Sequence, residues 1–165
     1  MLTPIQKIMA SLAILVFAGQ AHALTFAESA HNKNQSTLYG NVGFYGGEIA
    51  LGVEYETEIE KSHSAGGFFR YFGGNPSAIA LAGYIRIHTF KRAWDFYVSP
   101  GFGLLNGSSE TVLGPNLGFG VKYQFTPRFA AGMDLTTYHY WFGNKTVVAA
   151  LSGQSTLLAT LQFGL

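Results

Sequence analysis

The chain contains no cysteine, so neither disulfide bonds nor thiolate metal sites can stabilise its fold. Charged residues are also scarce, since only 12% of the 165 residues are Asp, Glu, Lys or Arg. Ten basic residues against nine acidic ones give no basic excess of the kind that binds a phosphate backbone, which argues against a nucleic-acid partner. At this length the sequence predicts one domain, stabilised by its own backbone pairing and packing.

Long apolar runs are missing as well, apart from one near the N-terminus. The segment "IMASLAILVFA" follows Lys7 and is succeeded by small residues ending in "AHA" at Ala23. A basic start, an apolar centre and a small-residue cleavage site predict a signal peptide over residues 1–23. About eleven apolar residues are too few for a membrane-spanning helix. Removal of the peptide leaves 142 residues with nine basic and nine acidic side chains.

Apolar residues are abundant, at 48% of the chain, but they alternate with small or polar residues. In "GFGVKYQFTPRFAAGMDL", residues 118–135, Phe119, Val121 and Tyr123 alternate with Gly118, Gly120 and Lys122. Because successive side chains of a strand point to opposite faces, this pattern predicts two half-buried strands joined by a tight turn at 126–128. A membrane β-barrel accommodates so apolar a chain without long apolar runs, since only alternate residues must face lipid.

The alternation recurs along the chain and predicts eight strands, at residues 37–45, 48–57, 65–73, 78–90, 93–104, 113–125, 129–141 and 155–165. The predicted fold is all-β, an eight-stranded antiparallel up-and-down transmembrane β-barrel over residues 37–165, preceded by a periplasmic lead-in at 24–36. The links "KR" and "TPR" are expected at the periplasmic end. "EIEKSHS" forms a further periplasmic link, while "NGSSET" and residues 142–154 form the longer outer loops.

The face that carries glycine, alanine and the charges is expected to point into the barrel. His88 then lies opposite Asp95 across the "KR" turn, and Lys122 lies diagonal to Asp134 across the "TPR" turn. Paired charges in a narrow lumen are more often structural than catalytic. The alternative is a soluble lipocalin-like barrel with the apolar face inside, but its outer surface would then be mostly glycine and alanine. The predicted lumen charge network comprises Glu54, Glu56, Arg70, Arg86, His88, Asp95, Lys122 and Asp134.

Aromatic residues are concentrated near the predicted strand ends, where a membrane barrel carries its two interfacial girdles. The expected periplasmic girdle contains Tyr55, Trp94, Phe125 and Phe129, and the expected outer girdle contains Phe44, Tyr71, Phe102 and Trp141.

The last segment, "TLLATLQFGL", is apolar at every second position up to the C-terminus. It resembles the terminal strand that Gram-negative outer-membrane barrels present to their assembly machinery, although it ends in leucine instead of an aromatic residue. With the 118–135 hairpin, it makes the chain similar to the small outer-membrane barrels of the OmpA-transmembrane, OmpX and OmpW-like group. The resemblance implies an outer-membrane location, a monomer, contact with outer-membrane lipid and lipopolysaccharide, and an assembly signal at Leu157, Leu161, Phe163 and Leu165.

Such families include stabilisers, adhesins, small-solute pores and lipid-modifying enzymes, and the fold does not choose among them. A PagL-like lipid A deacylase would use a Ser-His-acid arrangement. "TTYHYWFGN" supplies His139, but Trp141 replaces the serine that follows the histidine by two positions in that family. No metal-ligand spacing and no phosphate-binding loop are present, so no cofactor is expected. We therefore expect a non-enzymatic envelope-stabilising or surface-interaction protein, with an OmpW-like pore, the deacylase and the lipocalin-like carrier as alternatives.

Overall fold

The computed structural model describes residues 36–60, 62–91, 93–107, 110–126, 128–144 and 155–164. The predicted signal peptide, at 1–23, lies outside the described residues, and so does the lead-in except for Ser36, which already belongs to the first strand. Within the described ranges, no helix is long and apolar enough to cross a membrane.

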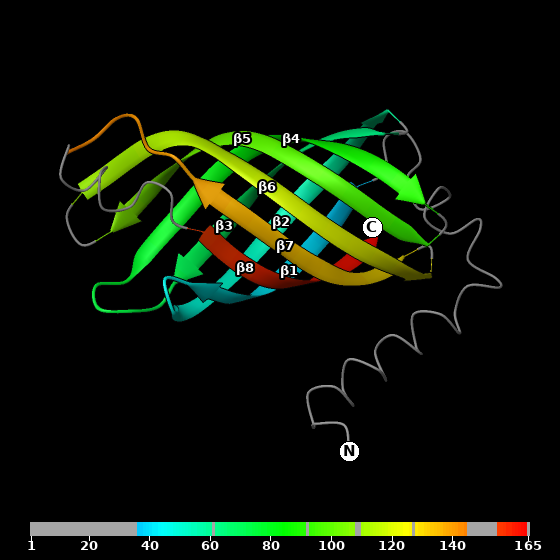
Figure 1. The fold of residues 1–165 in the computed structure, drawn as a ribbon, viewed down its shortest axis with the longest axis horizontal. Coiled ribbons are helices and arrows are strands. Elements are labelled where there is room, and N and C mark those ends of the chain that lie inside the picture. Colours follow the sequence, from blue (N-terminus) through cyan, green and yellow to red (C-terminus); the bar gives the residue numbers. More distant parts are fainter. Residues whose placement is uncertain are drawn as a thin grey trace, which may run out of the picture.

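The strands form one closed antiparallel barrel in which every strand pairs with its neighbours in sequence and β1 pairs with β8 (Figure 1). The predicted fold class is confirmed. The strands are β1 (Ser36–Tyr45), β2 (Glu48–Glu60), β3 (His63–Phe72), β4 (Ala78–Lys91), β5 (Trp94–Gly107), β6 (Glu110–Thr126), β7 (Phe129–Tyr138) and β8 (Ser155–Gly164).

Two polar segments that the sequence suggested as links are mostly strand. "EIEKSHS" contributes to β2 and β3, where Glu58 pairs with Ser64, and "NGSSET" contributes to β5 and β6, where Asn106 pairs with Thr111. The two links lie within the predicted segments but are shorter than predicted. Glu58 is a polar residue facing the lumen and Asn106 is an exposed polar residue at the barrel end, and both resemble loop residues in sequence. In the other direction, β7 ends at Tyr138, three residues early, although the backbone N–H of His139 still donates to the Pro115 carbonyl of β6 at 2.9 Å.

The two ends of the barrel differ in what they carry. One end, called the turn end here, carries the β2–β3, β4–β5 and β6–β7 links and the end of β8, and the opposite loop end carries the other links (Figure 1). At the loop end, Gly46 and Gly47 form the two-residue turn between β1 and β2 with φ of 58° and 91°. Positive φ at both positions is the hairpin geometry that follows strand twist, and it favours glycine.

The outer surface of the barrel is apolar and the interior is polar. Large apolar residues occupy alternate outward positions of every strand, as Leu51 and Val53 do on β2 and Ile85 and Ile87 on β4, and all four are exposed. Glu54 and Glu56, which follow Val53 at the alternate positions of β2, are buried inside. A register error of one residue would place the apolar side chains inside and the charged ones outside. The structure has the opposite arrangement, so the predicted facing of the strands is correct. The lipocalin-like alternative, which requires the apolar face inside, is wrong.

Candidate functional site

The lumen is the part of the barrel where charged side chains gather. All members of the predicted charge network point inward from β2, β3, β4, β5, β6 and β7, and none is more than 4% exposed. These residues are Glu54, Glu56, Arg70, Arg86, His88, Asp95, Lys122 and Asp134. The period-two alternation therefore places every predicted member inside, while their partners depend on contacts across the barrel.

Arg86 of β4 is the most extensively bonded of these residues. Its guanidinium donates to both neighbouring glutamates of β2, through Nη2 to Glu54 Oε1 at 2.6 Å and through Nη1 to Glu56 Oε2. Its Nε donates to Ser99 Oγ at 2.8 Å, and its planar group lies 4.1 Å from the ring centroid of Tyr97. Arg86 thus connects β2, β4 and β5 by charge-assisted hydrogen bonds in a water-poor interior.

Arg70 of β3 reaches the opposite wall of the barrel. Its Nη2 lies 3.3 Å from Asp134 Oδ1 and 3.7 Å from Glu54 Oε2, and its Nη1 donates to the hydroxyl of Tyr138 at 2.9 Å. Thr136 Oγ1 donates to the same Asp134 carboxylate at 2.6 Å. Because Asp134 and Tyr138 belong to β7, four strands away from β3, this cluster spans the lumen.

Lys122 of β6 makes a different pair from the one suggested by the sequence. Its Nζ lies 3.2 Å from Asp95 Oδ2 and donates to the Tyr39 hydroxyl at 2.9 Å, whereas Asp134 is bound by Arg70. The register explains the difference, since Asp95 lies directly opposite Lys122 while Asp134 lies opposite Gly120. His88 is opposite Tyr97, not Asp95, yet its Nδ1 is still 3.0 Å from both Asp95 oxygens.

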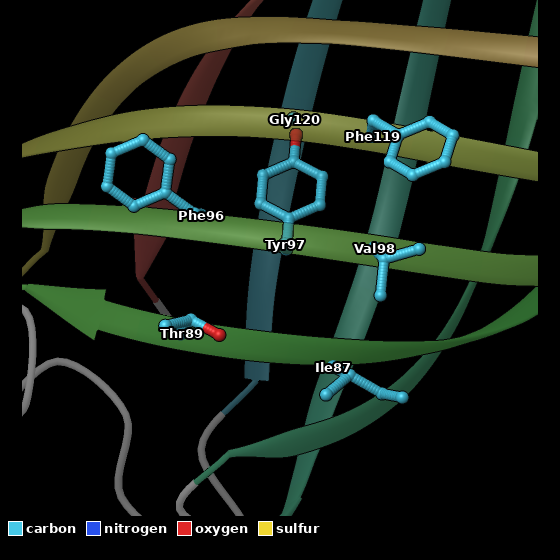
Figure 2. A pocket seen from close by; sticks show the side chains of 7 residues that line it. All are labelled: Ile87, Thr89, Phe96, Tyr97, Val98, Phe119 and Gly120. Atoms are coloured by element: carbon cyan, nitrogen blue, oxygen red, sulfur yellow. The ribbon is translucent and has the colours of Figure 1, made fainter.

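Close to the centre of the barrel wall, Gly120 makes room for Tyr97. Figure 2 shows the phenol of Tyr97 directed toward Gly120, and a Cβ at this glycine would overlap that ring. The Tyr97 hydroxyl donates to Asp134 at 3.3 Å. A hollow is lined by Tyr97 and Gly120 together with Ile87, Thr89, Phe96, Val98 and Phe119, all labelled in Figure 2. These neighbours offer little polar chemistry, so this hollow is not a candidate active site.

An aromatic cluster at the loop end of the lumen was not recognised in the sequence. Tyr45 stacks on Phe72 with ring centroids 4.2 Å apart, Tyr138 meets both rings edge-on, and Tyr140 stacks on Tyr138 at 6.1 Å. All four are buried. Their inward parity was the available signal, but the pattern alone does not tell that the ends of β1, β3 and β7 converge here. The cluster narrows the lumen on the loop-end side of Arg70.

A group of ionisable residues at the turn end was also missed. Glu56, Glu58 and His88 are buried and have potential ligand atoms within 4.8 Å of one another. Glu58 was expected in a link, and no metal-ligand spacing was expected, because the glutamates and the histidine are about thirty positions apart in the sequence. Only the pairing of β2 through β3 to β4 brings them together.

The predicted girdle residues lie on the outer surface, except that Trp94 is half-buried among neighbouring rings. At the turn end the rings form a continuous series from β5 to β8, with centroid separations of 5.0 to 6.0 Å. Phe102 lies deeper than expected because β5 continues to Gly107. The series consists of Trp94, Tyr123, Phe125, Phe129 and Phe163. Tyr55 is also exposed, on β2. The predicted residues of the other girdle are Phe44, Tyr71, Phe102 and Trp141.

The remaining predicted residues are on the outer face. Leu157, Leu161 and Phe163 of β8 are exposed, while Leu165 lies outside the described residues. His139 is exposed just beyond β7, beside Trp141, which is 67% exposed. Among the described residues, no hydrogen bond joins the side chain of His139 to a serine or threonine hydroxyl.

A closed eight-stranded barrel with a polar interior and an apolar exterior is the architecture of transmembrane β-barrels. No family model and no curated protein matches the sequence. Among solved structures, the chain is similar to the N-terminal β-barrel domain of Pseudomonas aeruginosa OprF, with a TM-score of 0.66 and 15% identity over 81% of this chain and 98% of that one.

Two further structures have the same fold. Neisserial surface protein A gives a TM-score of 0.54 at 11% identity, covering 78% of this chain and 94% of that one. The outer membrane enzyme PagL gives a TM-score of 0.50 at 13% identity, covering 77% and 98%. At these identities the likeness shows the fold, that of the small outer-membrane barrels, and it leaves the activity to be argued from the residues.

Proposed function

We propose that this protein is a non-enzymatic β-barrel of a Gram-negative outer membrane, with an envelope-stabilising or surface-interaction role. The apolar outer face supports a bilayer location, because so many exposed leucine, isoleucine, valine and phenylalanine side chains need lipid around them. The fold neighbours support the choice of membrane, since they are outer-membrane proteins. On this proposal the barrel is a monomer in contact with lipid and lipopolysaccharide, and β8 is the strand read by the assembly machinery.

The observation that carries the non-enzymatic part is the bridged lumen. Arg70 joins β3 to the facing β7, Arg86 joins β4 to β2, and Lys122 joins β6 to β5 and β1. A lumen crossed by such contacts at several heights leaves little room for a substrate. It also supports a plugged barrel over an OmpW-like pore.

We expect the purified protein to give no discrete single-channel steps in a planar lipid bilayer. As a positive control, Arg70→Ala combined with Phe72→Ala removes two of the largest fully buried side chains from the loop-end half of the lumen and is expected to produce small steps. A matched outward variant, Phe69→Ala, removes a ring from the same strand but not from the lumen, and should stay silent. Discrete steps from the unmodified protein would move it to the pore class.

A deacylase remains the alternative to test, because PagL shares the fold and His139 is exposed at the loop end. Incubation of the protein with lipopolysaccharide is expected to leave the mass spectrum of the lipid A unchanged. His139→Gln serves as the comparison. Loss of an acyl chain that occurs with the unmodified protein and disappears in His139→Gln would overturn the non-enzymatic proposal.

The surface-interaction part of the proposal rests on the loop end. A groove there is lined by the β3–β4 link and adjoining strand ends, and Trp141 and Phe142 are exposed beside the last part of β7. Exposed aromatic rings at the mouth of a barrel are suited to contact with a membrane interface or a partner surface. The groove is lined by Tyr71, Gly74, Asn75, Pro76, Ser77, Ala78, Ile79 and Asn106.

A further inference from the structure

Three metal-ligating side chains meet inside the turn end of the barrel. Glu56 and Glu58 are successive inward residues of β2, and His88 points inward from β4, two strands away. Each is at most 4% exposed, and one ligand atom from each lies within 4.8 Å of the others. Neither the proposed envelope role nor the plugged lumen requires a histidine between two carboxylates at this place.

The histidine is oriented as metal-bound histidines are. Its Nδ1 lies 3.0 Å from both oxygens of Asp95, so the N–H is donated to that carboxylate and Nε2 is turned toward the glutamates. A carboxylate behind the ligating histidine fixes the tautomer and the ring, and it raises the basicity of the other nitrogen. Ser64 Oγ forms a hydrogen bond with Nε2 at 2.9 Å, and a metal ion bound at Nε2 would replace this hydrogen bond.

The first glutamate directs one carboxylate oxygen at the histidine. Glu56 Oε2 accepts hydrogen bonds from Arg86 and Tyr84, which fixes the carboxylate. Glu56 Oε1 makes no hydrogen bond to the described residues and lies 3.2 Å from His88 Nε2. Two ligands bound tetrahedrally to zinc at 2.0–2.2 Å are about 3.4 Å apart, so the observed spacing is close to that of a coordination sphere.

The described part of the lumen is rich in buried carboxylates. Among the described buried side chains, five carboxylates face three permanently charged bases and one histidine. A divalent ion bound by Glu56, Glu58 and His88 would add positive charge beside these carboxylates. The carboxylates are Glu54, Glu56, Glu58, Asp95 and Asp134, and the bases are Arg70, Arg86 and Lys122.

We propose that Glu56, Glu58 and His88 bind one divalent transition-metal ion of the zinc class. One imidazole and two carboxylates suit Zn²⁺ better than Ca²⁺ or Mg²⁺, which take oxygen ligands in larger number. The ion links β2 to β4 across β3, and so fastens the end of the barrel where the β2–β3 and β4–β5 links lie. Its role is structural, since binding to the folded lumen stabilises the folded state.

The test uses the protein without a histidine tag, refolded from urea into detergent micelles with EDTA, with Zn²⁺ or with Ca²⁺. Refolding in the presence of the ion removes any barrier to its entry. We expect about one Zn²⁺ per barrel by calorimetry, and a higher temperature for the loss of the compact gel band with Zn²⁺ than with EDTA or Ca²⁺. Refolding with Co²⁺ is expected to give a visible absorption band from nitrogen and oxygen ligation.

Glu58→Gln keeps the size of the side chain and is expected to weaken Zn²⁺ binding by at least about tenfold, and Asp95→Asn by about 10–100-fold through the histidine. His88→Gln should abolish the cobalt band, and if that variant does not fold, Glu58→Gln decides. The matched control is the exposed pair at the same end, Glu60 and His63, whose atoms are 3.9 Å apart. Glu60→Gln and His63→Gln should change nothing.

Two results would overturn the proposal. One is the absence of Zn²⁺ binding after refolding with the ion, which would leave His88 as an ordinary member of the ion-pair network. The other is binding that survives Glu58→Gln at full strength or disappears in His63→Gln, which would place the ion at the surface.

Discussion

Replacing Arg86 with methionine is expected to lower the free energy of unfolding by about 3–5 kcal/mol, because it leaves two buried carboxylates without their main cation. Glu54 and Glu56 both accept hydrogen bonds from Arg86 and are nearly inaccessible to solvent. Glu54 keeps a second cation, because Arg70 Nη2 lies 3.7 Å from Glu54 Oε2. Most of the lost stabilisation is therefore expected to come from Glu56. The measurement is urea unfolding in lipid vesicles, followed by tryptophan fluorescence.

The control separates charge from packing. Arg86→Met combined with Glu54→Gln and Glu56→Gln neutralises the cluster, and it is expected to recover a large part of the lost free energy, since neutral groups need no counter-charge. If the Arg86→Met variant were as stable as the unmodified barrel, water would have to reach the two carboxylates. That result would count against the plugged lumen.

The second large effect is expected on the outer face. Ile85→Arg places a charge near the middle of β4, on a side chain that is 54% exposed, and should destabilise the folded barrel in lipid vesicles by about 2–4 kcal/mol. The physical reason is the transfer of a guanidinium to the centre of the hydrocarbon layer. Urea titration of folding into vesicles measures it.

Ile79→Arg is the matched control, because it changes the same residue type on the same face of the same strand, next to the loop end. Its expected loss is about 0–1 kcal/mol, since an arginine near the interface reaches water and headgroups. Equal losses at Ile79 and Ile85 would contradict a bilayer around this face, because only a bilayer makes the effect depend on depth.

The sequence by itself determined the strand order, the number of strands and the face of each residue. Successive side chains of a strand point to opposite faces, so the alternation from Gly118 to Leu135 shows for each residue whether it belongs to the apolar face. For the same reason Arg70, Arg86 and Lys122 could be placed in the lumen without coordinates. Strand ends were less well determined, because Glu58 and Asn106 are polar residues in lumen-facing or barrel-end positions and resemble loop residues.

Only the tertiary structure decided which side chains meet. Arg70 and Asp134 are 64 positions apart, and Lys122 and Tyr39 are 83 apart, yet each pair is in contact across the closed barrel. Such contacts depend on strand register, on the shear of the closed sheet and on side-chain length together, none of which a period-two pattern contains. The Glu56, Glu58 and His88 group and the loop-end aromatic cluster have the same origin, because closing the sheet brings inward residues of separate strands to one depth of the lumen.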